Sequence, residues 1–163
     1  MYSFFLHLLT LATLTHAATT PKCKAAPGSK DWPSNRAWAH LNDTLSGRLL
    51  APSPPGAVCH PGQPTYNAAT CPSIQAGWLT AVWHTYNPVS SIVNEYNNDT
   101  CLPFNGDPCS GEGYPLYVIN ATSAKDVKKG VDFARENNVR LIVKGTGHDY
   151  LGRSVCFVFM VHY

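Results

Sequence analysis

The chain has 163 residues, which suits one domain of ordinary size and is too short for a large two-domain enzyme. Charged residues make up 13% of it, against roughly 25% in an average soluble domain, and the net charge is +2 with no run of Lys or Arg. This composition argues against a charged disordered tail, and it predicts neither a nucleic-acid partner nor a membrane partner, since both favour a basic patch.

The first segment, residues 1–17, contains no Asp, Glu, Lys or Arg and carries an apolar stretch from Phe4 to Leu14. Small residues follow at Ala17 and Ala18, as at a cleavage site. The apolar stretch is too short to span a bilayer as a helix. We therefore predict a secretory signal and a secreted, extracellular product, with an amphipathic or buried helix as the alternative.

Two further features agree with export. The Asn-x-Thr glycosylation acceptor occurs at three positions: Asn42, Asn98 and Asn120. All six cysteines follow the signal, and in an oxidising compartment cysteines tend to pair. Cys101 and Cys109 enclose the turn-forming run LPFNGDP, so we predict a disulfide between them. Cys156 stands near the end of the chain, and the five cysteines before it leave at least one unpaired.

Residues 18–113 predict a loop-rich extension with short helices, because Pro and Gly are frequent there. Ser34 is suited to a helix N-cap, and a helix is expected from it to Gly47. Apolar residues recur after the cap at helical spacing: Trp38, Leu41 and Leu45.

A second helix is expected to begin at Ser73 and to end before Asn87-Pro88, after a Pro-rich loop over 51–72. Its apolar stripe is formed by residues at helical spacing: Ile74, Trp78 and Val82.

The pattern changes at residue 114. Tyr117-Val118-Ile119 predicts a strand, Ser123 an N-cap, and 123–138 a helix whose Val127 and Val131 face the strands. Leu141-Ile142-Val143 predicts a second strand, parallel to the first and reached by a right-handed crossover. Residues 114–154 therefore predict a βαβ unit, and the fold class as a whole is α+β.

A Gly-rich loop follows the second strand. Its glycines, Gly145 and Gly147, allow the backbone to approach a pyrophosphate, and successive N–H groups in such a loop can bind its oxygens. Ligands of α/β sheets bind at this end of the strands. From spacing alone, however, a plain strand-to-loop turn with a surface histidine at His148 is the favoured interpretation. The histidines and cysteines show no zinc-binding spacing, so no metal site is predicted.

The run PLYVINATSAKDVKKGVDFARENNVRLIVKGTGHDYLGRS, residues 115–154, resembles the start of a known flavin domain. It is the FAD-binding domain of the vanillyl-alcohol oxidase and p-cresol methylhydroxylase (PCMH) superfamily, above all of its fungal secreted berberine-bridge-like oxidases. Residues of the preceding stretch share the resemblance: Asp31-Trp32-Pro33-Ser34, Trp38, Leu41-Asn42, Gly47-Arg48-Leu49, Cys59-His60 and Cys71.

The resemblance implies FAD as cofactor, and it implies cofactor-binding residues in the loop: Lys144, Gly145, Thr146, Gly147, His148, Asp149, Gly152, Arg153 and Ser154. It makes His148 the candidate for a covalent bond to the flavin 8α-methyl carbon, although Thr146 replaces a glycine often found in the motif. It also implies hydride removal from a small-molecule alcohol or a carbohydrate hydroxyl, with oxygen as the electron acceptor. No residue is identified as the catalytic base.

The resemblance ends after Ser154. We interpret residues 114–154 as a truncated PCMH-type domain and 155–163 as an aberrant tail, translated from an intron, that packs poorly. A well-ordered central strand in this tail would count against that interpretation. Two functions remain open: the amino-terminal part of a secreted FAD-linked oxidase, inactive alone, or a small secreted disulfide-containing binding module without redox activity.

Overall fold

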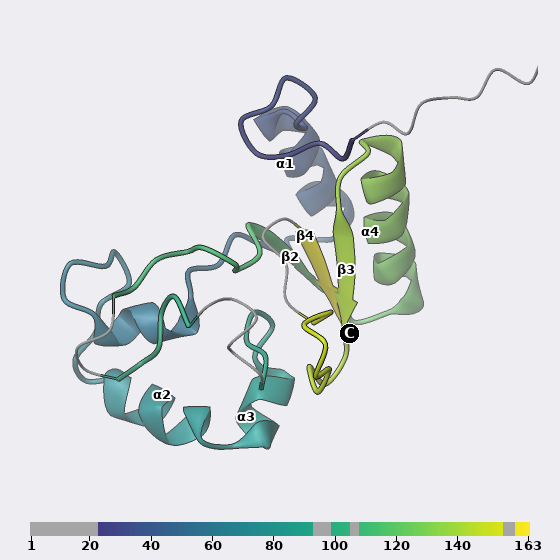
Figure 1. Ribbon diagram of the computed structural model, residues 1–163. Helices are drawn as coiled ribbons and strands as arrows, with labels where there is room; N and C mark the ends of the chain where they lie inside the picture. Colours follow the sequence, from purple (N-terminus) through teal and green to yellow (C-terminus); the bar gives the residue numbers. More distant parts are fainter. Residues whose placement is uncertain (1–22, 93–98, 105–107, 155–158) are drawn as a thin grey trace, which may run out of the picture.

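The structure is a computed structural model that describes residues 23–92, 99–104, 108–154 and 159–163 (Figure 1). Its elements in chain order are α1 (Asn35–Thr44), β1 (Leu49–Leu50), the 3-10 helix η1 (Pro55–Cys59), α2 (Cys71–Trp78), α3 (Ala81–Tyr86), β2 (Tyr117–Asn120), α4 (Ala124–Glu136), β3 (Leu141–Lys144) and β4 (Phe159–His162). None of the helices within these ranges is long and apolar enough to cross a membrane. Asn98 and Cys156 lie outside the described residues.

The four strands form one mixed sheet in the order β1-β2-β4-β3. β1 is antiparallel to β2, whereas β2, β4 and β3 are parallel to one another. The predicted strands and the helix between them are therefore confirmed, with β4 inserted between the two strands. The carboxyl ends of the parallel strands align Asn120, His162 and Lys144 in one row.

The prediction that the tail packs poorly is wrong. Phe159, Met160 and Val161 are fully buried in β4, which is hydrogen-bonded to a neighbour on each side. Residues 159–161 form the continuous apolar run that a strand buried on both faces requires, and the two parallel strands leave a gap of one strand between them. The sequence alone does not reveal this long-range pairing.

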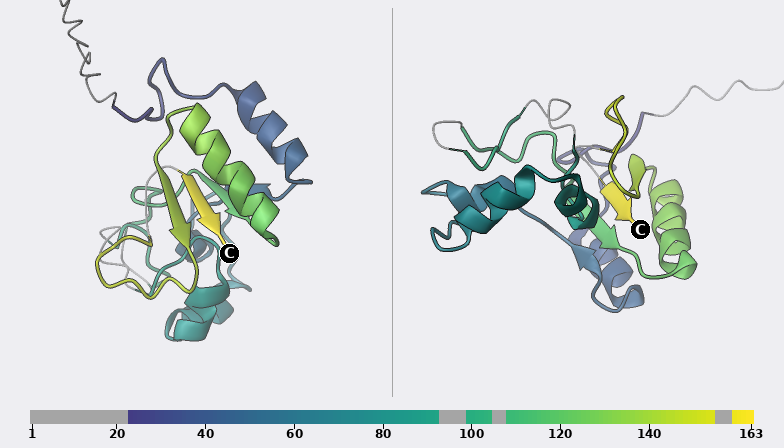
Figure 2. Two further views of the ribbon diagram at one scale, coloured as in Figure 1. Left: turned by 90° about the vertical axis from the view of Figure 1, so that its right-hand side faces the viewer. Right: turned by 90° about the horizontal axis from the view of Figure 1, so that it is seen from below.

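One face of the sheet is covered by α1 and α4, which lie side by side (Figure 2). Trp38 of α1 stacks on Tyr117 with ring centroids 4.1 Å apart, and it packs in the same core as Ile119, Ala134 and Phe159. The segment before residue 113 thus shares its core with the βαβ unit. The opposite face carries a smaller buried cluster: Val89, Val118 and Met160.

Both predicted N-caps are present. The Ser34 hydroxyl accepts the Ala37 N–H, and the Ser123 hydroxyl accepts the Asp126 N–H. Helix α4 can sit close to the sheet because Gly130 has no side chain. A Cβ at this position would lie 2.7 Å from the side chains of Ile119 and Val161. Val127 packs against the core as predicted. Val131 is instead 41% exposed, because its neighbour Gly130 is the residue that faces Ile119 and Val161.

An ion pair between a half-buried arginine and a buried carboxylate joins the residue before β1 to α4. Arg48 Nη2 lies 2.9 Å from Asp126 Oδ1, and Thr122 and Ser123 donate to the other carboxylate oxygen. Burial raises the pKa of Asp126, but the hydrogen bonds from Ser123, Arg48 and Thr122 outweigh burial and lower the pKa to about 2. This carboxylate therefore stays charged and fixes the start of α4.

The single helix predicted after residue 73 is two helices, α2 and α3. Thr80 interrupts it, because the Thr80 hydroxyl accepts the Trp83 N–H and starts a new helix. The turn brings the Trp83 ring against Gly77, where a Cβ would lie 2.5 Å from the indole. Val82, which the single-helix pattern placed on the apolar stripe, is consequently 67% exposed.

The predicted disulfide between Cys101 and Cys109 is present, with Cα atoms 4.0 Å apart. A second disulfide, which the sequence did not identify, joins Cys59 to Cys71. Cys23 is free and exposed, in agreement with the expected odd cysteine.

Candidate functional site

The Gly-rich loop begins where β3 ends, at the carboxyl ends of the parallel strands and beside α3 (Figure 1). Parallel strands of an α/β sheet present their ligands at this end. The nine loop residues implied by the family resemblance therefore lie in one region of the fold, from Lys144 to Ser154.

The two glycines of the loop have different surroundings. Gly147 is buried with φ +76°, and a Cβ there would lie 2.8 Å from Lys144 Cε. A Cβ at Gly145 would meet nothing within 4 Å, so the space above Gly145 is open. Gly147 is required for the loop to pack inward, whereas Gly145 leaves room for a ligand.

The exposed side of the loop presents hydrogen-bond donors. The backbone N–H groups of Gly145, Thr146 and His148 have no acceptor in the part of the chain that the structure describes, and all three residues are exposed. The Gly147 carbonyl, in contrast, points inward and accepts the Ser91 hydroxyl at 3.3 Å. Three free N–H groups within four residues form an arrangement suited to an anion.

The second half of the loop is closed by Asp149. Its carboxylate accepts the backbone N–H groups of Leu151 at 3.1 Å and Arg153 at 2.6 Å, and the Arg153 guanidinium at 2.8 Å. The side-chain bond from Arg153 is the largest cause that lowers the pKa of Asp149, and the same bond raises the pKa of Arg153. The contact fixes the turn over 149–153, which also contains Gly152 at φ +75° and leads to the buried Ser154.

Lys144 differs from the rest of the loop because it is fully buried. Its ammonium donates to the carbonyl oxygens of His84 at 3.1 Å, Thr85 at 3.2 Å and Asn87 at 3.0 Å. The Gly145 carbonyl oxygen lies 3.5 Å from the same nitrogen. Burial lowers the pKa of Lys144 to about 8. The resemblance implied a cofactor contact for this residue, but its ammonium is directed to the end of α3.

Two histidines near Lys144, the buried His84 and the half-buried His162, were not identified from the sequence. His84 Nε2 donates to the Trp78 carbonyl at 2.8 Å, so Nδ1 is the acceptor for the Ser90 hydroxyl at 2.5 Å. His162 Nε2 donates to the Thr85 carbonyl at 3.2 Å. Burial is the largest cause that lowers the pKa of each ring, and the positive charge of Lys144 lowers it further. No spacing in the sequence relates these histidines to the loop.

His148 lies on the exposed side of the loop, next to the free N–H groups. Its ring forms no hydrogen bond with any residue described in the structure. Of the glycosylation acceptors, Asn120 is exposed, whereas Asn42 is half-buried and its side-chain oxygen accepts the Leu49 N–H at 3.0 Å.

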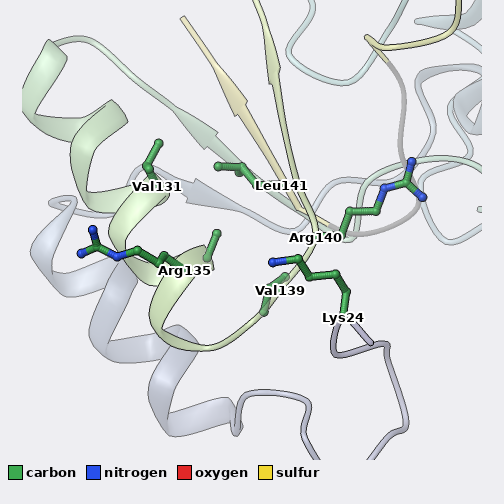
Figure 3. A pocket seen from close by; sticks show the side chains of 7 residues that line it. Lys24, Val131, Arg135, Val139, Arg140 and Leu141 are labelled. Carbon is green, nitrogen blue, oxygen red and sulfur yellow. The ribbon is translucent and has the colours of Figure 1, made fainter. Parts of the chain in front are cut away.

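Two other features resemble ligand sites, and only the first keeps groups that could bind one. A groove of about 350 Å³ lies at the opposite end of β3, with Lys24 extending over its apolar floor while Arg135 and Arg140 extend to opposite sides (Figure 3). The side chain of Arg135 is paired with Asp132 at 3.0 Å. His60 lies near the Cys101 and Cys109 sulfurs, which are bonded to each other and so cannot serve as thiolate ligands.

No family model matches the chain. Among curated proteins the chain is similar to the VAO-type flavoprotein oxidase VAO615 of Thermothelomyces thermophilus, with 39% identity over 165 residues. That alignment covers 94% of this chain and 28% of the relative. The FAD-linked oxidoreductase sor8 of Hypocrea jecorina is 37% identical over 89% of this chain and 25% of the relative. The chain thus spans about a quarter of the length of the curated relatives it matches.

Solved structures give the same result. The VAO-type flavoprotein MtVAO615 of Myceliophthora thermophila C1 superimposes with a TM-score of 0.76 and 38% identity, over 86% of this chain and 27% of that one. MtVAO713 of the same organism gives a TM-score of 0.78 and 31% identity, over 88% and 26%. The homologues of this chain are therefore VAO-type FAD-linked oxidoreductases, which bind FAD, and its small mixed sheet resembles their fold.

Proposed function

We propose that the chain acts as the amino-terminal part of an FAD-linked oxidoreductase, and that its loop 145–148 receives the FAD diphosphate. The observation that carries this proposal is the row of N–H groups at Gly145, Thr146 and His148, which meet no acceptor among the described residues and lie at the carboxyl end of a parallel strand. The homology to FAD-linked oxidoreductases supports the identity of the ligand.

The residues present fit a diphosphate. Gly145 has open space where a side chain would stand, so the phosphate oxygens can approach the backbone. The loop is held in shape from within, by the Gly147 carbonyl on Ser91 and by Asp149 on Arg153. Lys144 adds a buried positive charge below Gly145, which favours an anion above the loop without touching it.

His148 is the residue we propose for the covalent link to the flavin. It follows the left-handed Gly147, is exposed, and stands beside the proposed diphosphate site. The bound flavin would accept a hydride from the substrate. In this chain the loop binds and orients the cofactor, while the catalytic base is not assigned.

For the complete enzyme we propose a small-molecule alcohol or a carbohydrate hydroxyl as the substrate and oxygen as the electron acceptor. VAO615 is named an oxidase, which supports the acceptor. We also propose secretion, on the charge-free apolar segment 1–17, and glycosylation at the exposed Asn120 before the half-buried Asn42.

An NMR titration of the purified chain tests the diphosphate site. FAD and ADP are expected to shift the amide resonances of Gly145, Thr146 and His148, because each N–H would donate to a phosphate oxygen. Adenosine, which carries no phosphate, is the matched control and should leave these resonances unchanged. Shifts of equal size with adenosine, or shifts confined to other parts of the chain, would contradict the proposal and favour a binding module without a flavin.

A further inference from the structure

We propose that the segment 84–91 holds the loop 145–148 in its ligand-ready shape, with Lys144 as a positioning residue that contacts no cofactor. This inference rests on the proposed function in one respect only, namely that the loop is the FAD diphosphate site. The hold itself is a property of the protein without cofactor, and it can be tested in that state.

The first contact is the ammonium of Lys144. Its three short hydrogen bonds end on the carbonyl oxygens of His84, Thr85 and Asn87, at the end of α3. Those carbonyls belong to the last turn of a helix and to the residue after it, where carbonyl groups lack partners within the helix. Because Gly145 directly follows Lys144, these bonds fix the first residue of the loop relative to α3.

The second contact lies two residues further along the loop. The Ser91 hydroxyl donates to the Gly147 carbonyl at 3.3 Å, and a Cβ at Gly147 would lie 3.6 Å from the Ser90 carbonyl oxygen. The inward side of Gly147 thus rests directly on the segment 84–91. With its carbonyl held inward, the loop turns its next N–H, that of His148, to the exposed side.

The segment 84–91 is itself rigid. His84 is bonded through both ring nitrogens, to Trp78 and to Ser90, and it is 2% exposed. The Thr85 carbonyl accepts from both Lys144 and His162, so it also joins the segment to the central strand β4. The serine and histidine of this pair are too deeply buried for a substrate, which makes their role one of support.

The consequence is that the shape of the loop depends on residues about 60 positions earlier in the chain. A lysine and a serine that lie outside the row of free N–H groups then control nucleotide binding. Substitutions in 84–91 should weaken nucleotide binding although none of these residues faces the ligand.

Backbone ¹⁵N relaxation of the purified, ligand-free chain tests the hold, because order parameters report the mobility of amides whether or not they donate a hydrogen bond. Wild-type amides at 145–148 should have order parameters of about 0.85, the value of rigid backbone. Lys144→Met removes the ammonium and keeps most of the side-chain volume, and it should lower the order parameters at 145–148 below about 0.6. Ser91→Ala, a milder variant in case Lys144→Met fails to fold, should lower them by a smaller amount, with the largest loss at Gly147 and His148. Lys128→Met is the control, because this lysine is 74% exposed and lies on α4.

Order parameters in α4, residues 124–136, should stay at the wild-type level in Lys144→Met and Ser91→Ala. An equal fall in α4 and in the loop would mean general destabilisation, and unchanged order parameters at 145–148 in Ser91→Ala would mean that the segment does not hold the loop. Either result overturns the inference. Saturating ADP should restore the order parameters of the loop in both variants. If they fall as expected and ADP restores nothing, the hold is correct and the proposed diphosphate site is wrong.

Discussion

Alanine substitution at the two loop glycines separates a packing role from a ligand role. Gly147→Ala places a side chain on a backbone with φ +76°, which costs roughly 1–2 kcal/mol in an L-residue, and its Cβ would lie 2.8 Å from Lys144 Cε. The lysine must move, so part of its hydrogen bonding to carbonyl groups is lost, at about 1.5–3 kcal/mol for a charged donor. Together these effects predict a loss of about 2.5–5 kcal/mol in the free energy of unfolding.

Gly145→Ala is the matched comparison, two residues away in the same loop. Its Cβ meets nothing within 4 Å, so the free energy of unfolding should change by less than about 1 kcal/mol. Its affinity for ADP should nevertheless fall, because the methyl group occupies the space above the backbone. Thermal unfolding followed by tryptophan fluorescence provides the test. At roughly 2–4 °C per kcal/mol for a chain of this size, Gly147→Ala should melt about 5–20 °C below wild type. Equal melting temperatures for the two variants would refute the reasoning.

Three further outcomes are expected. Burial lowers the pKa of His84 and His162 below the ordinary value of 6.5, so the folded chain binds fewer protons than the unfolded chain as the pH falls. The free energy of unfolding should therefore fall between pH 7 and pH 5. A flat profile in denaturant titrations would contradict this. Val161→Asp should lower the free energy of unfolding by about 3 kcal/mol or more, since it buries an unpaired carboxylate. Val143→Asp should be tolerated, because Val143 is 55% exposed. Tolerance of both substitutions would mean that β4 is not part of the core. Cys23 should react with a maleimide before any reductant is added, and mass spectrometry of peptides should find the disulfide cysteines labelled only after reduction.

Local sequence signals predicted the elements that depend on nearby residues. Helix α4 has a serine cap, an acidic first turn and a regular apolar face, and the structure begins and ends it as expected. The disulfide between Cys101 and Cys109 closes a short loop and was also predictable. The free N–H groups lie in the loop that the glycines and the family resemblance indicated.

The features that sequence reasoning missed depend on distant contacts. β4 is a strand because β2 and β3 leave a place between them, and nothing within 159–162 reveals those neighbours. The break between α2 and α3 comes from the cap at Thr80, which competes with an otherwise continuous helical pattern. The buried position of Lys144 depends on carbonyl groups about 60 residues earlier, so its side chain could not be separated from the exposed loop residues.

The link between His148 and the flavin is the central claim, and one measurement tests it directly. Residues 23–163 would replace the matching quarter of VAO615, and flavin that stays with the protein after acid precipitation would be measured in the chimera and in two variants. The chimera and its His40→Ala variant, which changes an exposed histidine on α1, should retain the flavin. His148→Ala should lose it while the fold remains. Wild-type flavin content in denatured His148→Ala, on the same tryptic peptide, would contradict the assignment and return His148 to an ordinary surface turn.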